Sequence, residues 1–168
     1  MTQVFNIDAM IQSMCDQLKQ ECELKSLRDP LLIGIHTGGV WVAKQLKQKL
    51  ALDSKLGTLN ISFYRDDFTR IGVHPQVSPS QLPFQVEGRD IILVDDVLYT
   101  GRTIRAALNE IFDYGRPRRV MLAVLVERSG RELPIQADIV GQHIELEPGQ
   151  QVKLTGPEPL ALNLISAK

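Results

Sequence analysis

Hydrophobic residues recur every three or four positions near the start of the chain, which is the spacing of one face of an α-helix. This stripe covers residues 7–22, and Asn6 or Asp8 stands where a helix cap is expected. Similar stripes over residues 40–50 and 103–112 predict two further helices. Each predicted helix has one apolar face to bury against a core.

Short apolar runs alternate with these helices and predict buried strands. The runs cover residues 31–35, 58–64, 91–94 and 120–126, with shorter late strands at 139–140 and 152–154. Strands that alternate with helices are typical of a parallel sheet in the α/β class. Residues 65–88 hold three prolines and little periodicity, which predicts a long functional loop.

Composition fits one ordinary globular domain over residues 1–168, with 43% hydrophobic and 23% charged residues. No apolar run reaches the roughly 18 residues that suggest a membrane span, and the N-terminus lacks a signal-peptide pattern, so we expect a cytoplasmic protein. The net charge of −1 predicts no general attraction to nucleic acid. Residues 89–131 hold eight arginines against six acids, which allows a local anion site there.

The most informative segment joins the apolar run at 91–94 to the third helix. Asp95 and Asp96 follow this run directly, and residues 99–103 form a turn with threonine and glycine that opens the helix. Backbone N–H groups at a helix N-terminus, with threonine hydroxyls beside them, bind phosphate. Carboxylates repel phosphate but accept hydrogen bonds from vicinal hydroxyls, so the segment indicates a ribose 5-phosphate ligand.

Residues 94–103 resemble the motif that binds phosphoribosyl pyrophosphate (PRPP) in type I phosphoribosyltransferases. Three further stretches, at 64–67, 115–117 and 131–135, resemble the PyrR family in order and spacing. Members of this family are uracil phosphoribosyltransferases and attenuation regulators of pyrimidine operons. The resemblance covers nearly the whole chain. It implies the type I phosphoribosyltransferase fold: a central, mostly parallel sheet flanked by helices, with a small hood formed by the C-terminal strands.

The resemblance also implies roles for particular residues. Asp95 and Asp96 are expected to be catalytic and to hold the ribose hydroxyls of PRPP. Residues 34–39 would form the pyrophosphate loop, which in such enzymes often contains a non-proline cis peptide bond. Residues 65–85 would form a flexible loop that closes over the reacting centre. The residues expected to bind PRPP or the nucleotide are Thr37, Gly38, Gly39, Arg65, Val97, Leu98, Tyr99, Thr100, Gly101, Arg102, Thr103 and Arg128.

The implied reaction converts uracil and PRPP to UMP and pyrophosphate, with no membrane partner. Mg²⁺ is the expected cofactor, bound through PRPP and not by a dedicated set of protein ligands. UMP-promoted binding of pyrimidine operon leader RNA is implied as well, through a basic surface formed by Arg116, Arg118, Arg119 and Arg131. The resemblance further implies a homodimer or homotetramer, with Trp41 and the apolar face of the first helix as candidate contacts.

Two positions depart from the family pattern. Gly38 stands where many relatives have an arginine that grips pyrophosphate, which predicts weaker PRPP binding or slower transfer unless Arg65 or Arg70 substitutes. Ser129 and Gly130 stand where RNA-regulating relatives often carry glycine and histidine. Two alternatives therefore stay open: an RNA-binding attenuator or nucleotide sensor with little catalysis, and a phosphoribosyltransferase for another base.

Overall fold

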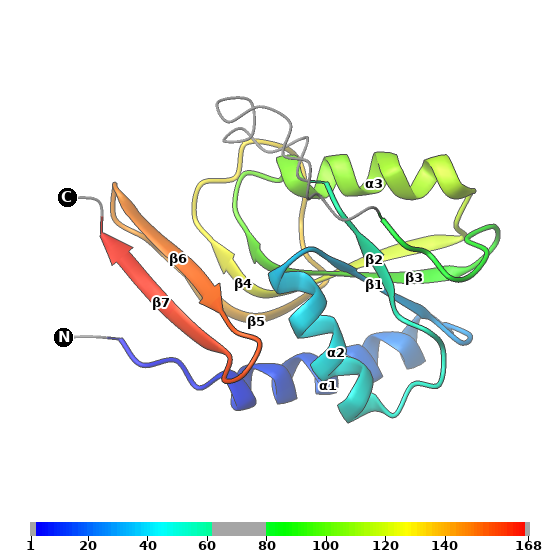
Figure 1. The fold of residues 1–168 in the computed structure, drawn as a ribbon, viewed down its shortest axis with the longest axis horizontal. Helices are drawn as coiled ribbons and strands as arrows, with labels where there is room; N and C mark the ends of the chain where they lie inside the picture. The colour runs from blue at the N-terminus through cyan, green and yellow to red at the C-terminus, as the bar shows by residue number, and fades with distance from the viewer. Residues whose placement is uncertain (1–2, 62–79, 167–168) are drawn as a thin grey trace.

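Five parallel strands form the central sheet in the order β2-β1-β3-β4-β5 (Figure 1). The computed structural model describes residues 3–61 and 80–166. The strands are β1 (Leu31–Ile35), β2 (Gly57–Leu59), β3 (Asp90–Leu98), β4 (Arg119–Arg128) and β5 (Ile139–Ile144). From β1 the chain first adds β2 on one side and then β3 on the other. In such a sheet, ligands bind at the carboxyl ends of the strands where the order reverses, here β1 and β3.

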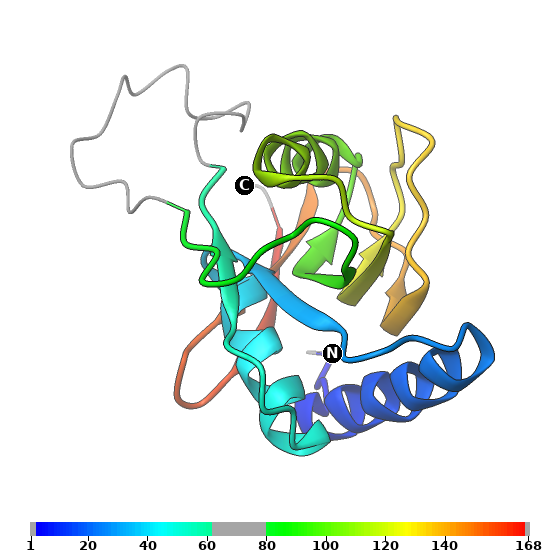
Figure 2. The same ribbon diagram turned by 90° about the vertical axis from the view of Figure 1, so that its right-hand side faces the viewer.

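Helices cover both faces of this sheet. They are α1 (Ile7–Leu24), α2 (Gly38–Leu50) and α3 (Arg102–Tyr114). Figures 1 and 2 show α1 and α2 on one face and α3 on the other. Ile92 and Val94 of β3 pack with α1 and α2, whereas Ile91 and Leu93, which point the opposite way, pack with α3. The expected α/β class is therefore confirmed, with one hydrophobic core on each face of the sheet.

An antiparallel pair, β6 (Gln150–Thr155) and β7 (Ala161–Ser166), forms the predicted C-terminal hood. Its residues Val152, Leu154 and Leu162 are at most 9% exposed and join the core on the α1 and α2 side. In Figure 1 the pair lies beside the end of the sheet at which β4 has its arrowhead. The hood therefore stands at the carboxyl edge of the sheet.

β3 is longer than the apolar run that predicts it. It continues through Asp95 and Asp96 to Leu98, because β4 pairs with it as far as Leu98 opposite Glu127. The two acids therefore lie within a strand and not after its end, which corrects the expectation from the sequence.

β2 ends at Leu59, where its partner β1 also ends, so residues 60 and 61 of the predicted strand 58–64 are not in the sheet. Residues 62–64 of that prediction lie outside the described part of the chain. Beyond β2, the backbone N–H of Asn60 donates to Ser80 Oγ at 2.8 Å. Ser80 belongs to the predicted flexible loop, so the last part of that loop is anchored to the sheet, whereas its residues 65–79 lie outside the described part of the chain.

The apolar face of α1 lies in the core. Met10, Ile11, Met14 and Leu18 are at most 5% exposed and pack with α2 and the sheet. The prediction that this face mediates contacts between copies of the chain is therefore wrong, because folding of one chain already buries it. Trp41 packs against the same core and is half-buried. Within the described ranges, no helix is both long and apolar enough to cross a membrane.

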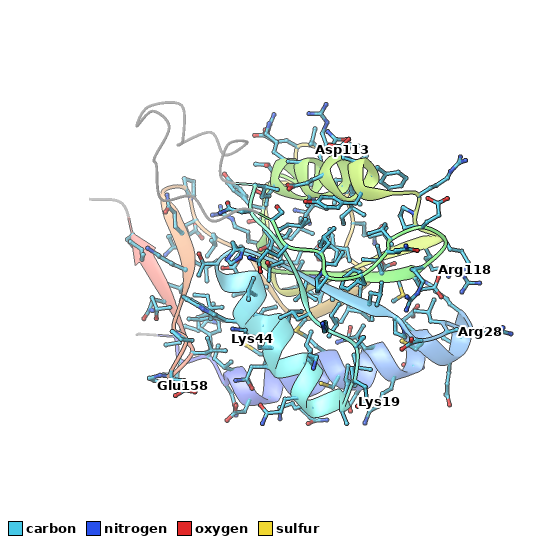
Figure 3. All side chains as sticks on the ribbon, turned by 45° about the vertical axis from the view of Figure 1, so that its right-hand side comes forward. Lys19, Arg28, Lys44, Asp113, Arg118 and Glu158 are labelled. Carbon is cyan, nitrogen blue, oxygen red and sulfur yellow. The ribbon has the colours of Figure 1, made fainter. Side chains whose placement is uncertain are left out.

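An ion pair with a buried carboxylate joins the amino ends of β3 and β4. Asp90 is 3% exposed, and its carboxylate accepts hydrogen bonds from Arg118, by Nε at 2.8 Å and by Nη2. The backbone N–H of Arg28 donates to the same carboxylate at 3.3 Å. The hydrogen bonds from Arg118 lower the pKa of Asp90, and burial opposes them without reversing the effect. Figure 3 shows Arg118 and Arg28 at this end of the sheet, so Arg118, expected at an RNA surface, has a structural partner.

We expect Asp90→Asn to lower the melting temperature at neutral pH by roughly 5 °C, since a hydrogen bond to a charged group stabilises more than a neutral one. The pKa of Asp90 is lower in the folded chain than in the unfolded chain. Its contribution is therefore present above about pH 4 and is lost as the pH falls through the folded value. Thermal melts of wild type and variant should converge at the acid end.

The matched control for this comparison is Asp53→Asn, which changes an exposed acid. It should leave the melting temperature nearly unchanged at every pH. A difference between wild type and Asp90→Asn that stays constant into acid would contradict the assignment of the stabilisation to the charged carboxylate.

Candidate functional site

The N-termini of α2 and α3 lie on either side of the end of β3. α2 begins at Gly38, directly after β1, and α3 begins at Arg102, after the turn that follows β3. Since β1 and β3 are neighbours in the sheet, both helices begin at its carboxyl edge. The N-cap residues of the two helices, Thr37 and Gly101, make no side-chain capping hydrogen bond. The partial positive charge of each N-terminus is therefore available to an anion near Asp95 and Asp96.

Asp95 and Asp96 are consecutive residues of β3, and their side chains point to opposite faces of the sheet. Asp95 is 2% exposed, and its Oδ1 accepts a hydrogen bond from the backbone N–H of Asp96 at 2.9 Å. Asp96 is half-buried, and its Oδ1 accepts from the N–H of Val97 at 2.8 Å. Backbone groups thus fix both carboxylates in position between the two helix N-termini.

The close approach of α2 to β3 requires glycine at position 39 and leaves little room at position 38 for more than glycine beside the present Asp96 side chain. A Cβ atom at Gly39 would lie 2.6 Å from the carbonyl oxygen of Val94. A Cβ atom at Gly38 would overlap the carboxylate of Asp96. Gly38, the departure from the family's arginine, therefore allows the N-terminus of α2 to lie directly against Asp96.

The loop between β1 and α2 is the segment that the family resemblance predicts to bind pyrophosphate. It contains the expected non-proline cis peptide bond, between His36 and Thr37. Burial, with a smaller contribution from Lys44, lowers the pKa of His36 below its ordinary value. His36 is therefore neutral at neutral pH. The positive potential of this loop comes from the helix N-terminus and not from an imidazolium.

Residues 99–103 form a second turn suited to an anion. Gly101 has a φ of 98°, a left-handed conformation that glycine adopts without strain, and it stands at the start of α3. The N–H of Arg102 donates to Thr100 Oγ1 at 3.2 Å, and the Arg102 side chain pairs with Glu132. Apart from the N–H of Arg102, the backbone N–H groups of the turn and of the first residues of α3 receive no side-chain capping bond from Gly101, which is an arrangement suited to phosphate.

A cavity of about 810 Å³ opens beside this turn. Its walls come from the end of β3, the turn and the start of α3, residues 128–130 after β4, and residues 146–152 of the hood. On the hood side, the lining residues are the apolar Leu146 and Val152 and the polar Glu147, Gln150 and Gln151. A cavity of this size with a few polar groups suits a small-molecule ligand.

Arg128 and Tyr99 close one side of the cavity. The guanidinium of Arg128 lies 3.8 Å from the centroid of the Tyr99 ring, a cation–π contact. Its Nε donates to the carbonyl of Ser129 at 3.2 Å, and its Nη1 to that of Gln150 at 3.4 Å. Gly130 lies against the same ring, since a Cβ there would be 2.5 Å from Tyr99 Cε2. Arg128 thus joins the phosphate turn to the hood.

The structure brings together nearly all the residues predicted to contact PRPP or the nucleotide. Asp95, Asp96, Arg128 and residues 97–103 line the cavity. Thr37 lies in the loop directly before α2, whose first residues, Gly38 and Gly39, lie against Asp96 and the end of β3. Arg65 lies outside the described residues.

The arginines predicted to bind RNA do not form one surface. Arg119 is the first residue of β4, and Arg131 follows Arg128, the last residue of the same strand. A strand of this length spans about 30 Å, so Arg116, Arg118 and Arg119 lie at the opposite edge of the sheet from Arg131. The expectation of one basic surface rested on the nearness of these arginines along the chain.

The family resemblance implies a hood of C-terminal strands over the base, but the sequence did not single out residues 146–152, which lead into and begin β6, as part of the cavity wall. Their signal is a proline and a glycine, Pro148 and Gly149, between two late strands. This signal predicts a turn. It is local, however, and contains no indication that the turn folds back toward β3.

A family model described as "Phosphoribosyl transferase domain" matches residues 2–159. Among solved structures, the chain is similar to a hypoxanthine phosphoribosyltransferase of Trypanosoma cruzi, with a TM-score of 0.66 and 23% identity, covering 86% of this chain and 78% of that one. It is also similar to a hypoxanthine-guanine phosphoribosyltransferase of Bacillus anthracis, with a TM-score of 0.68 and 16% identity, covering 90% and 86%. These likenesses confirm the expected type I phosphoribosyltransferase fold.

Proteins of known name are similar over nearly their whole length. "Bifunctional protein PyrR" of Nitrosococcus oceani is 63% identical over 161 residues, which cover 95% of this chain and 91% of that protein. The protein of the same name from Pseudomonas syringae pv. tomato is 53% identical over 155 residues, covering 92% and 91%. The chain therefore belongs to the PyrR family of proteins with a phosphoribosyltransferase domain.

Proposed function

We propose that the chain transfers the phosphoribosyl group of PRPP to uracil, forming UMP and pyrophosphate. The observation behind this proposal is the carboxylate pair between two helix N-termini at one edge of the sheet. PRPP has its groups in the same order: a pyrophosphate, a ribose with two vicinal hydroxyls, and a 5-phosphate. These groups would bind, in turn, at the start of α2, at Asp95 and Asp96, and at residues 99–103.

The reaction breaks the bond between ribose C1′ and a pyrophosphate oxygen and forms a bond from C1′ to N1 of uracil. The N1 proton of uracil passes to a pyrophosphate oxygen or to solvent. Positive charge develops on the ribose ring as the first bond breaks. Backbone N–H groups already fix the carboxylates of Asp95 and Asp96, so these carboxylates would stabilise that charge without reorganising.

The leaving pyrophosphate needs positive partners. The described part of the pyrophosphate loop offers the α2 N-terminus, since Gly38 has no side chain and His36 is neutral. Mg²⁺, when bound, neutralises charge on the leaving group. No three His, Cys, Asp or Glu side chains of the described residues gather as a metal site. As the family resemblance implies, oxygens of PRPP would hold Mg²⁺, and Asp95 and Asp96 would supply carboxylates at this edge of the sheet.

Uracil would bind in the part of the cavity that Arg128 and residues 146–152 line together. Leu146 and Val152 line this part of the cavity together with the polar residues 147 and 150–151. Such a wall suits a flat base that carries carbonyl and N–H groups on its edge. The membership of the PyrR family favours uracil, whereas the purine phosphoribosyltransferases of known structure share the fold at low identity.

We expect UMP to form when the protein is incubated with PRPP, Mg²⁺ and uracil. Parallel mixtures with orotate, adenine, guanine or hypoxanthine should form nucleotide more slowly or not at all. Chelation of Mg²⁺ should abolish the reaction, because the leaving group then loses its main counter-charge. Turnover should be low, since Gly38 leaves the loop without the family's arginine. Chromatographic identification of the nucleotide in each mixture measures all of these outcomes.

Two results of this assay would overturn the proposal in different ways. A purine nucleotide that forms faster than UMP would show that the base assignment is wrong. Tight UMP binding with no nucleotide formed from any base would instead identify a nucleotide sensor with little catalysis.

Asp95→Asn and Asp96→Asn should each lower kcat/KM for PRPP by roughly 10²-fold, the scale of one preorganised electrostatic group. Asparagine keeps the shape of the side chain and the oxygen that accepts the backbone hydrogen bond, so the fold should persist. Asp113→Asn, which changes an exposed acid on α3, is the matched control. Wild-type rates in both site variants would remove the carboxylate pair from the mechanism. A large fall in melting temperature would point to a structural role.

A second function is favoured by the name "Bifunctional protein PyrR" that the relatives share. We propose that UMP bound in the cavity promotes binding of a pyrimidine operon leader RNA, as the family resemblance implies. RNA binding requires a surface of unpaired positive charge. Of the predicted arginines, Arg118 pairs with Asp90, and Arg131 lies at the other edge of the sheet.

Lysines on α2 and just after it offer a better surface. Lys44, Lys47 and Lys55 line one surface hollow of about 600 Å³, in which Asp53 is the acidic lining residue. No ion pair joins these lysines to an acid of the described chain. Lys44, labelled on α2 in Figure 3, is also close enough to His36 to lower its pKa. The rest of the hollow lies at the C-terminal end of α2, so Lys44 is the lysine of the hollow that is nearest to the pyrophosphate loop.

Filter binding of the protein's own pyrimidine leader RNA, with and without UMP, tests this surface. The triple variant Lys44→Ala/Lys47→Ala/Lys55→Ala should weaken binding by about ten-fold or more and reduce the slope of log K against log salt by roughly 2. Arg116→Ala/Arg119→Ala is the matched control and should bind as wild type. Loss in the arginine variant alone would place the RNA at the amino edge of the sheet. Equal binding of an unrelated hairpin would reject the regulatory function.

A homodimer or homotetramer remains a proposal based on the family resemblance. The core already uses the apolar face of α1, so contacts between copies would involve other surfaces. Association would also place more than one lysine hollow on the same particle, which raises the local positive charge without changing the net charge per chain. A cytoplasmic location likewise remains a prediction from the sequence.

A further inference from the structure

The segment of residues 131–135 packs directly under the phosphate-binding turn. The backbone N–H groups of Glu132 and Leu133 both donate to the carbonyl of Thr100 at 3.0 Å. A Cβ atom at Gly101 would lie 3.1 Å from the nearest side chain of the segment, so the turn and the segment are also in close contact there. Residues 131–135 do not line the cavity. They support the turn from the side away from it.

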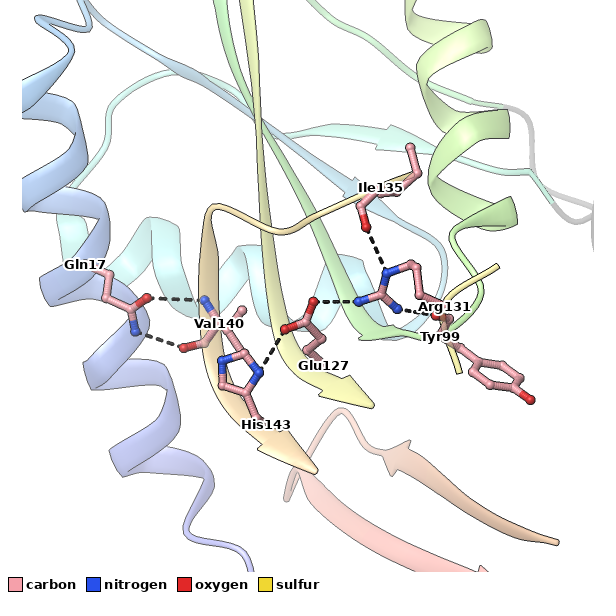
Figure 4. A network of polar contacts seen from close by, with 7 residues as sticks. All are labelled: Gln17, Tyr99, Glu127, Arg131, Ile135, Val140 and His143. Carbon is pink, nitrogen blue, oxygen red and sulfur yellow. Dashed lines mark hydrogen bonds and ion pairs between the residues drawn. The ribbon is translucent and has the colours of Figure 1, made fainter. Parts of the chain in front are cut away.

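Arg131 connects this segment to the turn. Its Nη1 donates to the carbonyl of Tyr99, and its Nε donates to the carbonyl of Ile135 at 2.8 Å. Its Nη2 donates to Glu127 Oε1 at 2.5 Å. Figure 4 shows the three contacts converging on one guanidinium. The planar group thus joins the phosphate turn, the supporting segment and the end of β4.

Glu127 anchors this guanidinium to the sheet. Its second oxygen, Oε2, lies 2.8 Å from Nδ1 of His143, and the register of β4 and β5 places these two residues opposite each other. The side chains of Glu127 and Arg131 are 18% and 24% exposed. Because the carboxylate balances the guanidinium, the pair adds little net charge beside the phosphate site. The guanidinium that the sequence assigned to RNA is engaged within the protein.

Because of the geometry of the peptide bond, these contacts also set the direction of two backbone N–H groups in the turn. In a trans peptide unit the carbonyl and the following N–H point in opposite directions. Arg131 holds the Tyr99 carbonyl on the side of the supporting segment, which directs the N–H of Thr100 away from that segment. Glu132 and Leu133 hold the Thr100 carbonyl in the same way, which directs the N–H of Gly101. The turn lines the cavity and the supporting segment does not, so an N–H group that points away from the segment is available to a ligand in the cavity.

We propose that Arg131 is a positioning residue that aims the backbone N–H groups of the turn at the 5-phosphate of PRPP and UMP. This inference rests on the proposed function, which places the 5-phosphate at residues 99–103. A lysine at position 131 would keep the charge but could not donate in one plane to three separate acceptors. Arg131→Lys should therefore free the Tyr99 carbonyl and weaken phosphate binding while leaving the pyrophosphate loop intact.

Calorimetric titration with ribose 5-phosphate and, separately, with Mg²⁺ and pyrophosphate tests the proposal. Arg131→Lys should raise Kd for ribose 5-phosphate by about ten-fold or more, the effect of losing one charged hydrogen bond. Kd for pyrophosphate should stay within about two-fold of wild type, since that ligand binds at the other helix N-terminus. Arg105→Lys, which changes an exposed arginine on α3, is the matched control and should bind both ligands as wild type.

In steady-state kinetics the same variant should raise KM for PRPP more than it lowers kcat, a split that a general loss of stability would not produce. Equal affinity for ribose 5-phosphate in folded Arg131→Lys and wild type would overturn the role of Arg131. Failure of the wild type itself to bind ribose 5-phosphate would overturn the proposed PRPP site instead. If Arg131→Lys does not fold, Glu127→Gln is titrated with ribose 5-phosphate in its place. A smaller rise in Kd is expected for this variant, and an unchanged Kd would contradict the proposal.

Discussion

The site depends on how closely the N-terminus of α2 approaches the end of β3. At Gly39 the approach leaves no room for even one carbon atom beside the Val94 carbonyl. This contact places an anion-binding helix N-terminus beside Asp96, although carboxylate and pyrophosphate repel each other. The arrangement is tolerable because backbone N–H groups hold both acids and because the N-termini of α2 and α3 add positive potential on either side. If α2 began further from β3, its N-terminus would be too far from Asp96 to bind the pyrophosphate of a PRPP molecule whose ribose lies at the two carboxylates.

Local patterns in the sequence predicted the helices and most of the strands, because hydrophobic period depends on neighbouring residues alone. The turn at 99–103 was predictable for the same reason, since its helix N-terminus and its threonines are consecutive. The continuation of β3 through Asp95 and Asp96 was not predictable from these patterns. Charged residues are uncommon in the interior of a strand. Asp95 and Asp96 lie in β3 because its backbone pairs with β4 as far as Glu127. The hood's place over the cavity likewise depends on how β6 and β7 pack against the main core.

The arginines show that nearness along the sequence does not predict nearness in the structure. Arg119 and Arg128 are close along the sequence, yet an extended strand places them at opposite edges of the sheet. Arg131 and Tyr99, in contrast, are 32 residues apart and share a hydrogen bond. The two edges also use buried aspartates differently. Asp90 is tied to a guanidinium at the amino edge and stabilises the fold, whereas Asp95 is held by a backbone N–H at the carboxyl edge, beside the cavity.

A crystal structure of the protein with UMP is the most direct test of the central claim, that two helix N-termini and a carboxylate pair form one ribose-phosphate site. The account predicts the 5-phosphate within hydrogen-bonding distance of the N–H groups of residues 100–102. The ribose hydroxyls should lie on Asp95 or Asp96, and the uracil in the part of the cavity lined by Arg128 and residues 146–152. A UMP phosphate bound at the N-terminus of α2 or in the lysine hollow, with the turn at 99–103 empty, would contradict the account.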